Sequence, residues 1–230
     1  MPHEHYTHAD VTGGWLRAST FGAMDGLVSN TALIAGVAAS ADAHTVLLTG
    51  VAGLLAGAFS MALGEFTSVR TANEQIDSEV RAERQAFEQF PRGEQMELVA
   101  MFKEIGMTTQ TAKTAAAEVH RDRERAVQFH LAQELGIDPM EKPSAGVAAG
   151  SSFVFFAIGA LIPLLPYLFG VQSPWPGLLF GAVGLVIAGA VAAHFAKVNT
   201  WFGAGRQLVF GSVAIAVTYF VGKLVGTVVT

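Results

Sequence analysis

Residues 22–30 read Gly-Ala-Met-Asp-Gly-Leu-Val-Ser-Asn, and they lie inside an apolar stretch that runs from about Leu16 to Ala39. A stretch of this length is long enough to cross a bilayer as a helix. It places Asp25 well inside the span, where an ionised carboxylate costs at least about 2.5–3.5 kcal/mol unless something compensates its charge. An acid in this position is therefore a candidate functional site.

The neighbours of Asp25 support that interpretation. Gly22 and Gly26 flank the acid at the spacing that allows two helix backbones to approach closely. Ser29 and Asn30 follow one turn later and offer further oxygen atoms. The sequence therefore predicts a tightly packed span with a cation-binding acid, placed near the two-fold axis of a dimer. An aspartate that caps a short interfacial helix is the alternative.

The composition indicates a membrane protein. Of the 230 residues, 51% are hydrophobic and only 14% are charged, whereas a soluble domain is usually about 25% charged. The absence of cysteine excludes disulfides, zinc–thiolate sites and iron–sulfur clusters. A net charge of −5 gives no reason to expect a nucleic-acid partner.

The first fourteen residues are polar and lack the order of a cleaved signal peptide, so we expect the first span to be retained. We expect these residues to form a disordered tail. Loose metal binding by His3, His5 and His8 is the alternative.

Four more apolar runs follow the first, at about residues 45–66, 146–170, 175–199 and 204–229. Pro163 and Pro166 are expected to kink or end the third span, and Pro174 and Pro176 to lie in a connecting turn. The sequence predicts an all-α membrane protein with five transmembrane helices. Its parts are a polar tail (1–14), spans one and two (15–66), a Glu-rich helical domain (67–142), whose cytoplasmic side and metal binding are argued below, and spans three to five (143–230).

The helical domain is predicted from residues that start and stop helices. No Pro or Gly interrupts residues 65–90, so the second span is expected to continue into a soluble helix. Pro91 suits the first turn of the next helix, and Thr108 or Thr109 could cap another. Gly136, with a proline beyond it, ends the last. The domain holds 14 Asp and Glu against 10 Lys and Arg.

The basic residues predict the orientation in the membrane. Arg17 precedes the first span, ten Lys and Arg lie between spans two and three, and Lys197 and Arg206 lie between spans four and five. The turns after the first and third spans contain none. By the positive-inside rule, the N-terminus and the helical domain are cytoplasmic and the C-terminus is on the opposite side. We expect the plasma membrane in a bacterium and a vacuolar-type membrane in a eukaryote.

The first candidate metal site lies within the membrane. Met61 and Glu65 share one face of the second span because they are four residues apart. With Asp25 they would offer carboxylate and thioether donors, a combination that suits a first-row divalent ion. The structural alternative is an Asp25 that pairs with Lys223 of the last span or is hydrogen-bonded to a neighbouring Ser or Asn.

The second candidate site lies in the helical domain, where acidic residues share helix faces in pairs. Folded together, they could form a carboxylate cage for a divalent metal, but the spacing alone favours a solvated acidic face. The candidate ligands are Glu79 and Glu83, Glu94 and Glu97, and His130 with Glu134 one turn later.

Several catalytic and energy-coupling motifs are absent. The chain has neither a GxxxxGK[ST] phosphate-binding loop nor a GxGxxG dinucleotide motif. It also has no GxSxG nucleophile elbow. The sequence therefore contains no visible site for ATP.

Taken in order, the motifs resemble the vacuolar iron transporter family, which includes iron and manganese transporters of plant and yeast vacuoles and many bacterial relatives. The resemblance covers the chain from Gly14 onward. It rests on DGLVSN (25–30), SMALGE (60–65), FPRGEQMEL (90–98), ELG (134–136), IPLLPYL (162–168) and GxxRQLxxGxxAxxVTY (203–219).

The resemblance implies five transmembrane helices, a homodimer with the ion path between its subunits, and proton-coupled export of Fe²⁺ from the cytosol. It places the family's pathway aspartate on Asp25 and its pathway methionine on Met61. Its cytoplasmic metal-binding glutamates fall on Glu83, Glu94, Glu97 and Glu134.

The chain departs from the family pattern in the helical domain. One family glutamate falls on Ala86, and a family methionine pair falls on His130 and Leu131. The site is therefore expected to hold fewer ions or to prefer another metal. His130 is a candidate replacement ligand for Fe²⁺, Mn²⁺ or Zn²⁺.

The sequence thus predicts a divalent-metal/proton antiporter and not an enzyme. Fe²⁺ is the expected substrate, with Mn²⁺, Co²⁺ and Zn²⁺ as further candidates, protons as counter-ion and no prosthetic group. The expected partners are a second copy of the chain and membrane lipid. The predicted transport pathway consists of Asp25, Ser29, Asn30, Met61 and Glu65.

Two alternatives belong to other functional classes. One is a passive divalent-cation channel or a metal-sensing membrane protein. The other, a remote one, is a membrane-anchored di-iron oxidase, which requires Glu-x-x-His pairs on two helices. Ala117 precedes His120 and Val127 precedes His130 at that spacing, so the pairs are missing.

Overall fold

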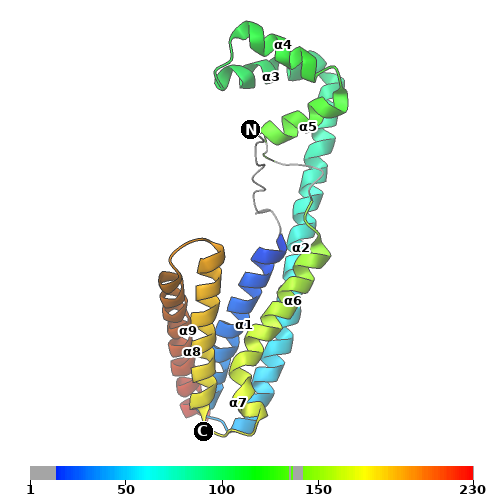
Figure 1. Cartoon of the computed structure of the whole chain (residues 1–230). Coiled ribbons are helices and arrows are strands. Elements are labelled where there is room, and N and C mark those ends of the chain that lie inside the picture. The colour runs from blue at the N-terminus through cyan, green and yellow to red at the C-terminus, as the bar shows by residue number, and fades with distance from the viewer. Residues whose placement is uncertain (1–13, 135, 137–141, 230) are drawn as a thin grey trace. The chain divides into compact units, whose positions relative to one another are not determined.

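A computed structural model describes residues 14–134, 136 and 142–229 of the chain (Figure 1). These residues form helices and no strand. The predicted tail lies outside the described residues, histidines included, except for Gly14, which begins the first helix. The chain divides into two compact units. The spanning unit comprises the residues up to Ser68 and those from Ser144 onward, and the inserted unit is Val69–Pro143.

The spanning unit contains the five helices that the sequence predicts as membrane spans. They are α1 (Gly14–Ala38), the first part of α2 (Ala43–Gln89), α6 (Ala145–Leu161) with its continuation, α8 (Pro174–Phe195) and α9 (Thr200–Val229). All five are long and apolar enough to cross a bilayer. The 22 residues of α8 span about 33 Å at 1.5 Å per residue, close to the thickness of a hydrocarbon core.

Helix α1 is the central helix of the spanning unit, and it packs against α6, α8 and α9 (Figure 1). Glycine permits the closest of these contacts. A Cβ atom on Gly26 would lie 2.2 Å from the carbonyl oxygen of Phe156, and one on Gly159 would lie 2.3 Å from that of Ala23. Gly22 and Gly26 therefore pack against α6 of the same chain.

Helix α2 meets its neighbours through their side chains. A Cβ on Gly50 would clash with Leu164, one on Gly53 with Leu33, and one on Gly57 with the ring of Phe156. The glycine face of α2, formed by Gly50, Gly53 and Gly57, therefore accommodates side chains from α1, α6 and the segment after α6. This arrangement leaves space between α2 and the α1–α6 pair.

The prolines of the third span end its regular helix, as predicted. Helix α6 stops at Leu161, and the chain continues through the 3₁₀ turn η1 (Ile162–Leu164) into the short helix α7 (Leu165–Leu168). The expectation for the next pair was wrong. Pro174 and Pro176 lie in the first turn of α8, where a proline loses no helical hydrogen bond.

The inserted unit combines the last part of α2 with α3 (Pro91–Glu104), α4 (Thr109–Val119) and α5 (Arg123–Glu134). Thr108 caps α4 by accepting a hydrogen bond from the backbone N–H of Thr111. Gly106 ends α3 with a φ angle of +96°, a conformation that glycine adopts at no steric cost. Leu98 and Phe102 of α3 pack on two buried alanines of α4.

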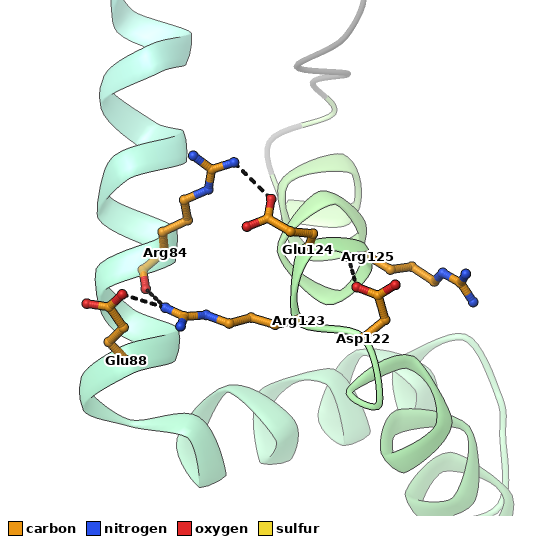
Figure 2. A network of polar contacts seen from close by, with 6 residues as sticks. All are labelled: Arg84, Glu88, Asp122, Arg123, Glu124 and Arg125. Atoms are coloured by element: carbon orange, nitrogen blue, oxygen red, sulfur yellow. Dashed lines mark hydrogen bonds and ion pairs between the residues drawn. The ribbon is translucent and has the colours of Figure 1, made fainter.

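Ion pairs hold α5 against α2 in the inserted unit (Figure 2). Arg84 pairs with Glu124 at 2.8 Å, and Arg123 pairs with Glu88 at the same distance. Arg123 also donates a hydrogen bond to the backbone oxygen of Arg84, which ties the start of α5 to the α2 backbone. Because the charged groups are about half exposed, each pair contributes under about 1 kcal/mol. Phe87 and Val127 form the apolar contact beneath them.

Candidate metal sites

A pocket of about 280 Å³ lies in the spanning unit between α1, α2 and α6. The pocket lies beside Gly53 and Gly57, in the space between α2 and the packed pair α1 and α6. Four of the five residues predicted for the pathway line it. The lining residues are Asp25, Ser29, Asn30, Leu33, Gly53, Gly57, Ser60, Met61 and Phe156.

The acid in the pocket has a hydroxyl partner on its own helix. Ser29 lies one turn after Asp25, and its Oγ donates a hydrogen bond of 2.7 Å to Oδ1 of the carboxylate. Among the ion pairs of the described residues, none joins Asp25 to Lys223, so the lysine alternative has no support in the structure. The other alternative, a hydrogen bond from a neighbouring Ser or Asn, is present, because Ser29 donates one to Asp25. This bond occupies one lone pair of one oxygen and leaves the carboxylate able to bind a cation.

Asn30 also lines the pocket and is only 2% exposed. Its Nδ2 atom donates a hydrogen bond of 2.6 Å to the carbonyl oxygen of Ala160 on α6. This bond links α1 to α6 at the level of the pocket.

Met61 lines the pocket from α2, whereas Glu65 does not. Oε1 of Glu65 instead accepts a hydrogen bond of 2.9 Å from the guanidinium of Arg17 near the start of α1, and the two residues form an ion pair. The glutamate side chain is 16% exposed and the arginine side chain 73%. Sequence reasoning used Arg17 only to orient the first span, since nothing in the local pattern connects residues on two different helices.

Five lining residues were not predicted for the pathway, namely Leu33, Gly53, Gly57, Ser60 and Phe156. Ser60 adds a hydroxyl beside Met61, and the SMALGE motif could have indicated it. Phe156 supplies an apolar wall, and its ring fills the space that Gly57 leaves open. From the sequence alone, a phenylalanine that lines a pocket cannot be told apart from one that faces lipid.

The second site lies in the inserted unit, where Glu83 of α2, Glu94 of α3 and His130 of α5 meet. One potential ligand atom from each residue lies within 4.8 Å of the other two. Nδ1 of His130 lies 3.4 Å from Oε1 of Glu83 and 3.6 Å from Oε2 of Glu94. His130 is completely buried, and the two glutamate side chains are 14% and 12% exposed. These two glutamates therefore do not lie on a solvated acidic face.

Aromatic groups enclose His130. The ring of Phe87 lies edge-on to it at 5.0 Å, and the ring of His120 lies at 5.4 Å. Burial lowers the pKa of His130, and His120 acts in the same direction, while Glu94 and Glu97 oppose the shift. The lowered pKa favours the neutral imidazole, which is the form that binds metal ions. His120 itself was not predicted as a site residue and lies outside the group of three.

The other predicted ligands of this domain are placed differently. Glu97 is exposed one turn after Glu94, close enough to His130 to influence its pKa. Glu79 is half-buried one turn before Glu83. Glu134 is the last residue of α5, and its side chain lies outside what the structure describes.

The two sites offer different donor sets. The pocket combines carboxylate, amide, hydroxyl and thioether groups, and the thioether favours a softer first-row ion over Mg²⁺ or Ca²⁺. The inserted unit combines two carboxylates with an imidazole, a set suited to Fe²⁺, Zn²⁺ or Mn²⁺. In both places the carboxylates are partly or largely removed from solvent, which favours a compensating cation, because burying an isolated ion costs several kcal/mol.

Known proteins resemble this chain over most of its length. A family model described as the VIT family matches residues 16–223. The chain is 36% identical to a vacuolar iron transporter of Acanthamoeba castellanii over 219 residues, which cover 93% of this chain and 79% of that protein. It is 31% identical to vacuolar iron transporter homolog 1 of Arabidopsis thaliana, covering 93% and 84%. It is 27% identical to vacuolar iron transporter 1 of rice, Oryza sativa subsp. japonica, covering 98% and 90%.

These matches confirm the family resemblance drawn from the motifs. The relatives are named as transporters, which confirms the prediction that the chain is not an enzyme. Together with the five apolar helices, they establish a multi-pass integral membrane protein.

Proposed function

Since the chain belongs to the VIT family, we propose that it exports Fe²⁺, and also Mn²⁺, from the cytosol in exchange for protons. The observation that carries this proposal is the pocket in the spanning unit. Asp25 from α1 and Met61 from α2, 36 positions apart in the chain (61 − 25), line the same cavity. A hard and a soft donor side by side suit a first-row divalent ion.

Proton coupling follows from the chemistry of the acid. A carboxylate binds a metal ion only when it is deprotonated, so metal and proton compete for Asp25. A transporter that exposes Asp25 to each side in turn would load metal where protons are scarce and release it where they are abundant. The soft Met61 ligand has no proton to exchange and keeps contact with the ion throughout.

The inserted unit supports a role in capturing metal from the cytosol. Glu83, Glu94 and His130 form a compact group of potential ligands, with Glu97 and Glu79 one turn away. Glu134 is a further candidate ligand. In this proposal the unit binds ions at low concentration and raises their supply to the transport pathway, while the pocket performs the transport itself.

The orientation is proposed from the distribution of charge. Of the 14 Lys and Arg residues, 13 lie on the side assigned to the cytosol, and Lys223 is the exception. The N-terminus and the inserted unit are then cytosolic, and the C-terminus lies on the other side.

A homodimer is proposed because the pocket of one chain supplies a single carboxylate and borders an exposed surface. Phe21, one turn before Asp25, is 63% exposed, and Ser29 and Ser60 at the pocket are exposed too. A second copy on this face would bring a second Asp25 close to the first, so that two chains share one ion path.

The test is metal transport by the purified protein in liposomes, with Fe²⁺, Mn²⁺, Co²⁺ and Zn²⁺ and with or without a pH gradient. We expect Fe²⁺ and Mn²⁺ transport that is driven by an opposing proton gradient and stops when an ionophore collapses it. Metal flux that persists without the gradient indicates a passive channel. Metal binding without flux indicates a sensor.

A further inference from the structure

The amide of Asn30 holds a fixed orientation in the pocket of the spanning unit. The carbonyl oxygen of Ala160 can only accept a hydrogen bond, so the atom that faces it at 2.6 Å is the NH₂ group. The amide oxygen Oδ1 therefore points away from α6. Because α1 and α6 are in backbone contact at Gly26 and Gly159, the helix pair maintains this orientation.

The amide oxygen is buried and faces the glycine side of α2. Asn30 is 2% exposed, and Oδ1 accepts no hydrogen bond from the residues that the structure describes. A Cβ atom on Gly53 would lie 3.3 Å from this oxygen, and Gly53 itself lines the pocket. A buried acceptor without a partner is unfavourable, so the position favours a hydrogen-bond donor or a cation beside this oxygen.

We propose that Oδ1 of Asn30 is a direct ligand of the transported ion and sets its selectivity among divalent metals. This proposal rests on the proposed transport function. Asn30 supplies a neutral oxygen that no proton can displace, whereas protonation removes Asp25 as a ligand. An amide oxygen, a carboxylate and a thioether together favour a first-row ion over Mg²⁺, whose geometry demands more oxygen ligands.

Three substitutions test whether Asn30 is a metal ligand or only a structural link between α1 and α6. Asn30→Leu keeps the size of the side chain and removes both the oxygen and the donor. Asn30→Asp removes the donor to Ala160 but keeps an oxygen. Gly53→Ala leaves the Asn30–Ala160 bond in place and puts a methyl group against Oδ1. Its closest clash is with the flexible end of Leu33, so the helix should tolerate it.

The measurement is the concentration dependence of Fe²⁺ and Mn²⁺ transport in liposomes, together with the thermal stability of each purified variant. We expect Asn30→Leu and Gly53→Ala to raise KM for Fe²⁺ about tenfold or more. Asn30→Asp should keep a KM near that of the wild type and shift the preference toward Mn²⁺. Gly64→Ala, on the same helix with open space around it, is the matched control and should change neither.

Other outcomes overturn the proposal. If Asn30→Asp and Asn30→Leu are equally impaired and equally destabilised, Asn30 is only a structural link. If Gly53→Ala keeps the wild-type KM and metal order, Oδ1 is not a ligand, and this variant decides the question if Asn30→Leu does not fold. A wild-type protein that moves no metal overturns the proposed function and this inference together.

Discussion

In the inserted unit, Nδ1 of His130 on α5 lies 3.4 Å from Oε1 of Glu83 on α2. Ion pairs of Arg84 with Glu124 and of Arg123 with Glu88 join the same two helices near the start of α5 (Figure 2). Glu94 completes the group from α3. An imidazole thus stands where the family pattern suggested a methionine, and its nitrogen faces two carboxylates.

The first prediction concerns this imidazole. Replacing His130 with Ala should lower the metal affinity of the purified protein by at least about 10–100-fold. That is the usual loss when a residue that only hydrogen-bonds to a metal ligand is removed, and His130 is proposed as a ligand itself. His130→Met, which restores the family residue and fills the buried space, should keep binding but shift the preference away from Zn²⁺. Isothermal titration with Zn²⁺, Co²⁺ and Mn²⁺ measures both effects. Unchanged affinity in a folded His130→Ala protein would exclude the imidazole as a ligand.

The second prediction tests metal capture. Glu94→Ala combined with Glu97→Ala should lower the transport rate at limiting Fe²⁺, because the inserted unit loses carboxylate ligands. At saturating Fe²⁺ the rate should be close to that of the wild type, since the pocket in the spanning unit is intact. A loss of rate that is equal at all Fe²⁺ concentrations would contradict a capture role.

The third prediction concerns the acid of the pocket. Asp25→Asn should abolish Fe²⁺ transport, because the amide carries no charge for the ion and no proton to exchange. Ser29 can still donate its hydrogen bond to the amide oxygen, so the fold should persist. Initial rates in liposomes and size-exclusion chromatography check the two parts. Wild-type rates from a well-folded variant would refute the mechanism.

The fourth prediction concerns Met61. Met61→Ala should slow Fe²⁺ transport about tenfold and favour Mn²⁺ over Fe²⁺, because the soft thioether donor is lost. Met61→Leu is the control for packing, since it keeps the volume of the side chain at a cost usually under about 1.5 kcal/mol. Both variants should show the same shift in metal preference. If Met61→Leu behaves as the wild type, the methionine only fills space.

The fifth prediction places the dimer contact. The chain has no cysteine, so a single introduced thiol reports one position. Phe21→Cys should crosslink two chains in the membrane, because this residue is exposed on α1 one turn before the acid. Leu27→Cys is the control, since Leu27 is 2% exposed and faces Gly184 of its own chain. If Leu27→Cys crosslinks and Phe21→Cys does not, the two chains do not meet at the face of α1 that carries Phe21.

The sequence by itself determined the number and nature of the membrane spans. Apolar runs of membrane length predicted the five spans, and local signals such as Pro91, Thr108 and Gly106 set the helix ends in the inserted unit. These features are local, because a cap, a proline or a hydrophobic run acts on its own segment. For the same reason Asp25 was recognisable as a candidate site from its surroundings in the chain alone.

Only the tertiary structure decided which residues meet. It directed Gly22 and Gly26 to α6, paired Glu65 with Arg17 away from the pocket, and gathered Glu83, Glu94 and His130 from three helices. Helical spacing shows which residues share a face but not which face of another helix lies opposite. That choice depends on how side chains and glycine gaps of distant segments fit together, as Gly57 does with Phe156.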